Sequence, residues 1–171
     1  MIEGTDWTTI IVALISASAG SVVPIALHLS GKRRDRKSVS ASIIAEVVSL
    51  LQLASARGYV AMLDIERQNL ALRLSGASVF GQTEVAPAVF RLPVPENYNL
   101  IYRENASKIG YLMPSDAIEV VKFYQLIQSV LADVSEGGFL YQGTRDLRQM
   151  DNTIVMLEEA LEIGRAFAAK A

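Results

Sequence analysis

Residues 7–31 read WTTIIVALISASAGSVVPIALHLSG, and residues 32–37 continue as KRRDRK. The first stretch holds 25 residues without a charge, whereas five of the next six are basic. Because a helix rises 1.5 Å per residue, this stretch spans roughly 37 Å and crosses a hydrocarbon core of about 30 Å with some tilt. The sequence therefore predicts a transmembrane helix over 7–31 and a basic juxtamembrane segment over 32–37.

The distribution of charge predicts the orientation of this span. The residues before it carry only Glu3 and Asp6, which are acidic. The residues after it carry a basic cluster, which consists of Lys32, Arg33, Arg34, Arg36 and Lys37. By the positive-inside rule the basic end stays in the cytoplasm, where it also contacts anionic lipid. We expect residues 1–6 outside a bacterial inner membrane and residues 38–171 in the cytoplasm.

Two other interpretations of the apolar stretch fit less well. A cleaved signal peptide has basic residues before a shorter apolar core and small residues at a cleavage site after it. Here the small residues Ala17-Ser18-Ala19 lie in the middle of the run. A buried core helix of a soluble protein leaves the basic cluster unexplained.

Small side chains recur at three- and four-residue steps along the predicted span. Those that form its candidate packing face are Ala13, Ser16, Ala17 and Gly20. In lipid, small residues allow close backbone approach, which is a main source of helix association. The span is therefore either a plain anchor or a self-associating one.

The 140 residues after the span are enough for one domain with its own core. They carry 16 basic and 16 acidic residues, because the other two acidic residues precede the span. Such a neutral body has no electrostatic footprint for nucleic acid. The chain has no cysteine, which excludes disulfides and thiolate chemistry and suits a reducing cytoplasm.

The cytoplasmic body shows helical rather than strand periodicity. Residues 38–74 predict one long amphipathic helix, either continuous with the span or interrupted near Gly31. Glycine and proline residues in 75–95 predict a loop, and its apolar residues indicate that the loop packs on the bundle. Residues 96–113 predict a third helix. Ser115 is the expected N-cap of a fourth, which ends near Gly137-Gly138.

The last predicted helix has the clearest pattern. Apolar or small residues follow alternating three- and four-residue steps at Leu140, Gly143, Leu147, Met150, Ile154, Leu157, Leu161, Gly164 and Ala168. Such a heptad repeat packs against a neighbouring helix, either in the bundle core or in another subunit. The expected fold class is all-α: an N-terminal transmembrane helix followed by a cytoplasmic bundle of about four helices.

The usual nucleophile–base pairs are not available, because the predicted cytoplasmic body has no histidine and the chain has no cysteine. His28, the single histidine, lies in the predicted span and has no cysteine or second histidine to share a metal. The bundle contains no Glu-x-x-His pair, and no glycine-rich phosphate loop ends in Lys-Ser/Thr. We therefore expect no catalytic, metal or cofactor residues and a protein that is not an enzyme; the alternative is a helical enzyme that works without histidine or cysteine catalysis.

One segment carries a distinctive pattern: Tyr102, Asn105, Ile109, Gly110, Leu112 and Pro114. It resembles a Tyr-x-x-Asn-x-x-x-Ile/Leu-Gly-x-Leu-x-Pro pattern in small uncharacterised bacterial proteins with one N-terminal membrane helix. The resemblance implies the architecture and no activity. In one interpretation Asn105 bonds backbone at a tight corner and Gly110 permits a left-handed helix end. In the other, a polar corner or pocket is lined by Tyr102, Arg103, Asn105, Gly110 and Tyr124.

These observations favour a membrane-anchored helical scaffold, sensor or effector that acts through self-association and protein partners. Its expected partners are membrane lipid, a second copy of the chain and another protein. The layout also resembles membrane-perturbing or pore-forming accessory proteins of phage-defence systems. A further alternative is a small-ligand-binding helical domain with the 75–95 loop as its lid.

Overall fold

The computed structural model describes the backbone of residues 7–80, 84–92 and 95–170. Within these ranges, side chains are described for residue 31 and from residue 33 onward, except residues 78 and 80. The elements are α1 (Trp7–Arg57), α2 (Tyr59–Phe80), α3 (Leu100–Glu104), the 3-10 helix η1 (Ala106–Tyr111), α4 (Pro114–Val134), α5 (Phe139–Gln142) and α6 (Leu147–Ala168). The described residues form no strand, and the predicted all-α class is confirmed.

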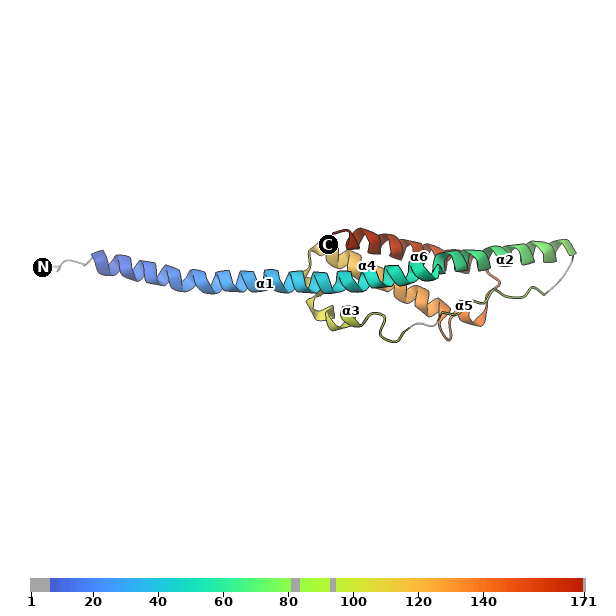
Figure 1. Ribbon diagram of the computed structural model, residues 1–171, viewed down its shortest axis with the longest axis horizontal. Coiled ribbons are helices and arrows are strands. Elements are labelled where there is room, and N and C mark those ends of the chain that lie inside the picture. The colour runs from blue at the N-terminus through green and yellow to red at the C-terminus, as the bar shows by residue number, and fades with distance from the viewer. Residues whose placement is uncertain (1–6, 81–83, 93–94, 171) are drawn as a thin grey trace.

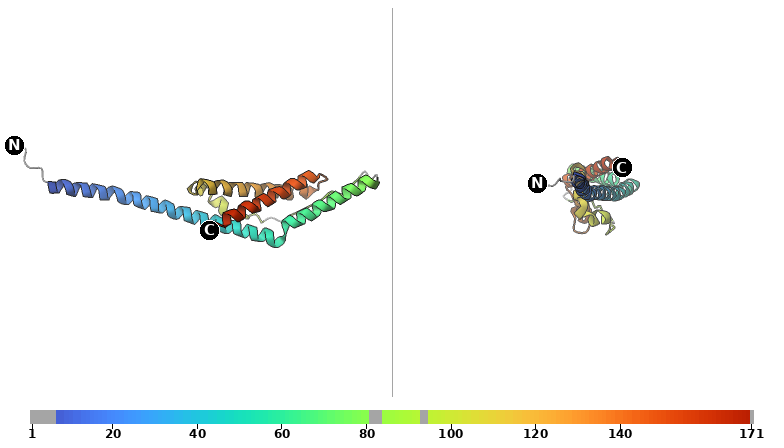
Figure 2. Two further views of the ribbon diagram at one scale, coloured as in Figure 1. Left: turned by 90° about the horizontal axis from the view of Figure 1, so that it is seen from above. Right: turned by 90° about the vertical axis from the view of Figure 1, so that its left-hand side faces the viewer.

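Helix α1 continues without interruption through Gly31, and its N-terminal part projects well beyond the other helices (Figure 1). The predicted single helix over 38–74 is wrong at Gly58, where φ is +62°. Glycine reaches this left-handed conformation without a steric penalty, and the chain turns there into α2 (Figure 2). This bend, the α1–α2 elbow, lets α1 and α2 both pack on α6.

Part of α1 is apolar and long enough to cross a membrane. Among the described side chains the candidate lies in Arg33–Arg57, where the most apolar 18-residue window has a mean hydropathy of 1.7. The core helix of a soluble protein and an N-terminal signal sequence pass the same test of length and composition. In this stretch Val39, Ile43 and Val47 are buried in the bundle. The span predicted over 7–31 is helical, but the side chains of residues 7–30 lie outside the described part.

Helix α6 is the centre of the bundle and packs on α4, α1 and α2. Its buried residues include Met150, Leu157, Leu161 and Gly164, as the heptad repeat predicts for a bundle core. Residue 164 has to be small, because a Cβ added there would lie 2.9 Å from the Phe123 ring of α4. The predicted single helix from Leu140 onward is instead divided into α5 and α6.

The predicted loop crosses the bundle as a strap, which we define as residues 84–92. Ala88 and Thr144 form a two-way backbone bridge with N–O distances of 2.8 and 2.9 Å. The Phe90 N–H donates to the Leu140 carbonyl at 2.8 Å, and both Ala88 and Phe90 are buried. The loop was expected to begin at 75, but α2 extends to Phe80; residues 81–83 and 93–94 lie outside the described part.

The third helix is shorter than the pattern over 96–113 predicts. Only α3 and η1 form there, separated by Asn105. Helix α4 begins at Pro114, and its N-cap is Met113. The N-cap therefore lies two residues before Ser115, where it was expected. Proline suits this first helical position, because its missing N–H would have no intrahelical partner there.

Candidate functional site

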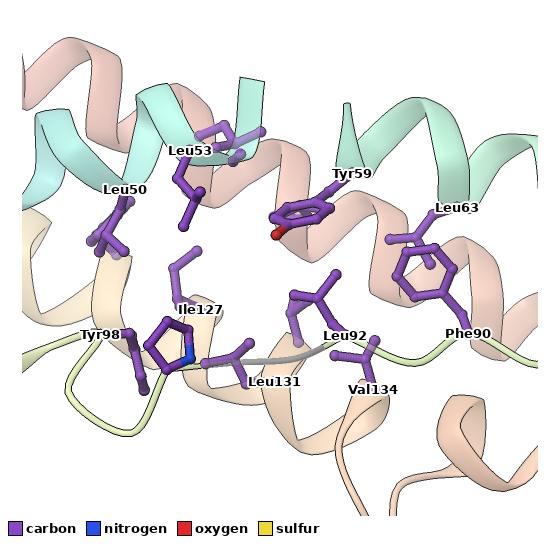
Figure 3. A pocket seen from close by; sticks show the side chains of 16 residues that line it. Leu50, Leu53, Tyr59, Leu63, Phe90, Leu92, Tyr98, Ile127, Leu131 and Val134 are labelled. Carbon is purple, nitrogen blue, oxygen red and sulfur yellow. The ribbon is translucent and has the colours of Figure 1, made fainter. Parts of the chain in front are cut away.

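An apolar pocket lies at the inner side of the α1–α2 elbow and has a volume of about 80 Å³. Side chains of the elbow face those of α4, of the strap and of the chain segment that follows the strap (Figure 3). The lining consists of Leu50, Leu53, Ala54, Tyr59, Leu63, Phe90, Leu92, Pro95, Tyr98, Phe123, Ile127, Val130, Leu131, Val134, Leu157 and Leu161.

The pocket offers almost no polar chemistry. The described residues of its lining include no ionisable carboxylate, amine or imidazole, and their side-chain polar atoms are the hydroxyls of Tyr59 and Tyr98. Such a surface binds apolar groups by removing them from water. A dry cavity of roughly 150 Å³ binds benzene, so this smaller pocket suits the end of an alkyl chain better than an aromatic ring.

A buried carboxylate lies beside the pocket. Glu46 on α1 is only 8% exposed, and its side chain accepts three hydrogen bonds. The donors are the backbone N–H groups of Ile101 and Tyr102, at 2.8 and 3.0 Å, and the Tyr124 hydroxyl, at 2.5 Å. The first N–H groups of a helix have no intrahelical partner, so Glu46 caps α3 from a distant helix.

Aromatic packing completes this polar corner. The rings of Tyr102 and Tyr124 are stacked with centroids 3.9 Å apart, and Phe123 meets Tyr124 edge-on at 5.0 Å. Burial, followed by the hydrogen bond to Glu46, raises the pKa of the Tyr124 hydroxyl far above its usual 10. Tyr124 therefore remains protonated and donates to Glu46. Because Phe123 also lines the pocket, the corner supports one of the pocket walls.

The structure brings together two of the five residues predicted for the polar corner, Tyr102 and Tyr124. Asn105 instead donates from Nδ2 to the Ile101 carbonyl at 2.9 Å, a local backbone role that the sequence also suggested. Arg103 is exposed. Gly110 is also exposed, and its φ is not positive, so the expected left-handed helix end there is wrong.

Sequence reasoning missed Glu46 as the centre of this corner. A signal was present, because Glu46 is the only charged residue between Lys37 and Arg57. A lone charge in an apolar amphipathic segment often has a buried partner. Its backbone partners lie 55 and 56 residues further along the chain, where no local pattern identifies them.

The residues predicted to act at the membrane lie on α1. The candidate packing face of Ala13, Ser16, Ala17 and Gly20 is helical, but its side chains lie outside the described part, as does the side chain of Lys32. The other basic residues are all exposed; they are Arg33, Arg34, Arg36 and Lys37. Three of these line a groove that also includes Phe167, near the end of α6, and Lys170, just after it.

Within the described ranges, no group of three or more histidine, cysteine, aspartate or glutamate side chains is arranged to hold a metal ion. Comparison with known proteins found no matching family model, no matching curated protein and no matching solved structure.

Proposed function

We propose that this protein is a membrane-anchored helical scaffold that acts through self-association and contacts with protein partners. The observation that supports this most strongly is the continuity of α1 from Trp7 to Arg57. The first half of this helix has the uncharged 25-residue sequence, and the second half packs in the bundle through buried Val39, Ile43 and Val47.

A continuous helix is a stiff connection. At 1.5 Å per residue, the 51 residues of α1 extend about 77 Å, and no loop separates the proposed membrane segment from the core. The exposed basic residues Arg33, Arg34, Arg36 and Lys37 follow the uncharged segment on the same helix, where lipid headgroups would lie. A displacement or rotation of the anchor would therefore be transmitted directly to the bundle.

The test of this proposal is the topology of the full chain. We expect a C-terminal fluorescent reporter to be active in the membrane fraction and a C-terminal alkaline phosphatase to be inactive, because the basic cluster retains the body in the cytoplasm. Replacing all five basic residues of 32–37 by glutamine should weaken this preference. Arg33, Arg34, Arg36 and Lys37 are exposed, so glutamine at these four positions does not disturb the core.

Two outcomes would contradict the proposal, one its orientation and the other its anchor. High phosphatase activity without fluorescence would place residues 38–171 on the external side of the membrane and reverse the proposed orientation. A fluorescent fusion that remains in the supernatant after the membranes are pelleted would remove the anchor altogether.

A second candidate function, binding of an apolar small molecule, is favoured by the pocket at the elbow. Its largely apolar lining and its volume suit an alkyl chain end. The strap contributes Phe90 to the wall, which agrees with the idea that this segment acts as a lid.

Photolabelling can test this second function on the full chain in membranes. We expect an octanol that carries a diazirine to label pocket residues such as Leu50 and Ile127. Ala54→Phe should reduce this labelling by about tenfold, because the new ring occupies the pocket. Ala56→Phe is the matched control, since Ala56 is exposed two residues further along α1 and lines no part of the pocket. Equal labelling of both variants would contradict a pocket ligand.

A further inference from the structure

Helix α2 has one face in the bundle and another in solvent. Leu63, Leu70 and Ala77 are buried, and Arg67 Nε pairs with Asp151 Oδ1 of α6 at 2.7 Å. The opposite face carries large apolar side chains with high exposed fractions: Met62 49%, Ile65 56%, Leu72 70% and Val79 78%. Scattered exposed apolar residues are normal, but four on one face of one helix form a row.

The spacing of this row is that of a coiled coil. Met62, Ile65, Asn69, Leu72, Gly76 and Val79 follow steps of 3, 4, 3, 4 and 3 residues, and we call them the α2 seam. These are the a and d positions of a heptad repeat, and the period of 3.5 residues keeps the seam facing a partner helix along its length. A single asparagine at an a position is a known device that fixes register and oligomeric state.

We infer that the α2 seam binds the α2 seam of a second copy of this chain, as a parallel, in-register pair. The core heptad of α6 does not compete for this role, because its own face is buried in the bundle. The parallel orientation rests on the proposed membrane anchor, since two copies inserted the same way direct their α2 helices alike. Asn69 then faces Asn69 of the second copy, where their amides form a hydrogen bond.

Charges beside the seam agree with self-pairing. The flanking e positions are Glu66 and Arg73, and the g positions Ala61, Gln68 and Ser75 are uncharged. In a parallel pair each flanking charge meets a neutral residue of the other copy, so no like charges oppose each other. An antiparallel pair would place Glu66 beside Arg73 of the other copy, which is an attractive contact, so the charges permit self-pairing in either direction and the parallel orientation follows from the anchor alone.

The α2 seam is short, so membrane anchoring would help the pair to form. The 22 residues of α2 extend about 33 Å, which is three heptads, and two of the six seam positions are Asn69 and Gly76. Confinement to one membrane raises the effective concentration of the two copies, which favours a weak interface without any new contact.

Disulfide crosslinking provides a direct test, because the chain has no cysteine of its own. Ile65→Cys and Val79→Cys are introduced singly into the full chain in membranes, followed by mild oxidation. These positions are about 21 Å apart along α2. A parallel, in-register pair brings each one opposite itself within disulfide reach, so both variants should form dimers. Ile118→Cys, on the 68% exposed Ile118 of α4, should not.

A charge on the seam should remove the dimer. Leu72→Glu, added to either cysteine variant, should reduce the crosslinked fraction by at least about tenfold, because it places two like charges at one buried layer. Ile118→Glu is the matched control, since Ile118 and Leu72 have nearly the same exposure, 68% and 70%, and neither substitution disturbs the core. We expect no change in crosslinking for Ile118→Glu.

The results separate this inference from the proposed function. Crosslinking at only one of the two positions would show an antiparallel or shifted pair and overturn the inference. The absence of dimers at both positions would also overturn the inference. Dimers at both positions in a protein that fails the topology test would support the seam and overturn only the membrane anchor. Gly20→Leu, which obstructs the candidate packing face in the span, should leave seam crosslinking intact.

Discussion

Glu46→Leu is expected to lower the free energy of unfolding of the bundle by about 3–5 kcal/mol, because it leaves three hydrogen-bond donors without an acceptor. Two of these are the N–H groups at the start of α3, which have no intrahelical alternative. The third is the hydroxyl of buried Tyr124. Chemical denaturation of the purified full chain in mild detergent, followed by circular dichroism, measures the change.

The companion substitution Tyr124→Phe should cost much less, about 1 kcal/mol, because the carboxylate keeps its two backbone donors. In the Glu46→Leu background the effect of Tyr124→Phe on the free energy of unfolding should have the opposite sign. There Tyr124→Phe removes an orphaned hydroxyl and should stabilise the protein. Additive effects in this double-mutant cycle would contradict the hydrogen-bonded corner.

Gly138→Ala is expected to destabilise the protein by about 3 kcal/mol, since a Cβ at this position has no space. It would lie 2.2 Å from the Ala132 carbonyl oxygen and 2.3 Å from that of Asp133. Both are backbone atoms at the end of α4, so the turn into α5 would have to open. The Gly138 N–H, which donates to the Ser135 carbonyl at 2.8 Å, holds this turn closed.

Gly110→Ala is the control for this prediction. A Cβ at Gly110 meets nothing within 4 Å, and its backbone is not left-handed. Alanine there should be neutral or slightly stabilising, by up to about 1 kcal/mol, because it restricts the unfolded chain. The same denaturation measurement compares both variants. A loss at Gly110 as large as that at Gly138 would contradict the described turn.

Several features follow from the sequence alone because their causes are local. The uncharged residues 7–31 and the basic residues after them predict an apolar helix with a charged end. The heptad repeat around Met150, Leu157 and Leu161 identifies the core face of α6, since residues at this spacing must lie on one side of a helix. Proline and glycine residues likewise mark 75–95 as a change from helix to loop, although α2 extends a few residues into it.

Other features depend on contacts between distant residues. Glycine also occurs inside helices, so Gly58 alone does not predict the α1–α2 elbow. The turn there is favourable because it lets α1 and α2 both pack on α6. The pocket combines side chains from Leu50 to Leu161, and no window of the sequence contains its pattern.

The corner at Glu46 shows the difference most clearly. Sequence marks the glutamate as a lone charge among apolar residues, but its donors belong to α3 and α4, more than 50 residues away. The α3 segment forms only a short helix, and its first N–H groups are bound by a side chain from α1 rather than by a local cap. Periodicity determines which face of a helix is apolar, whereas the tertiary structure decides which distant polar groups meet, because burial requires each of them to find a partner.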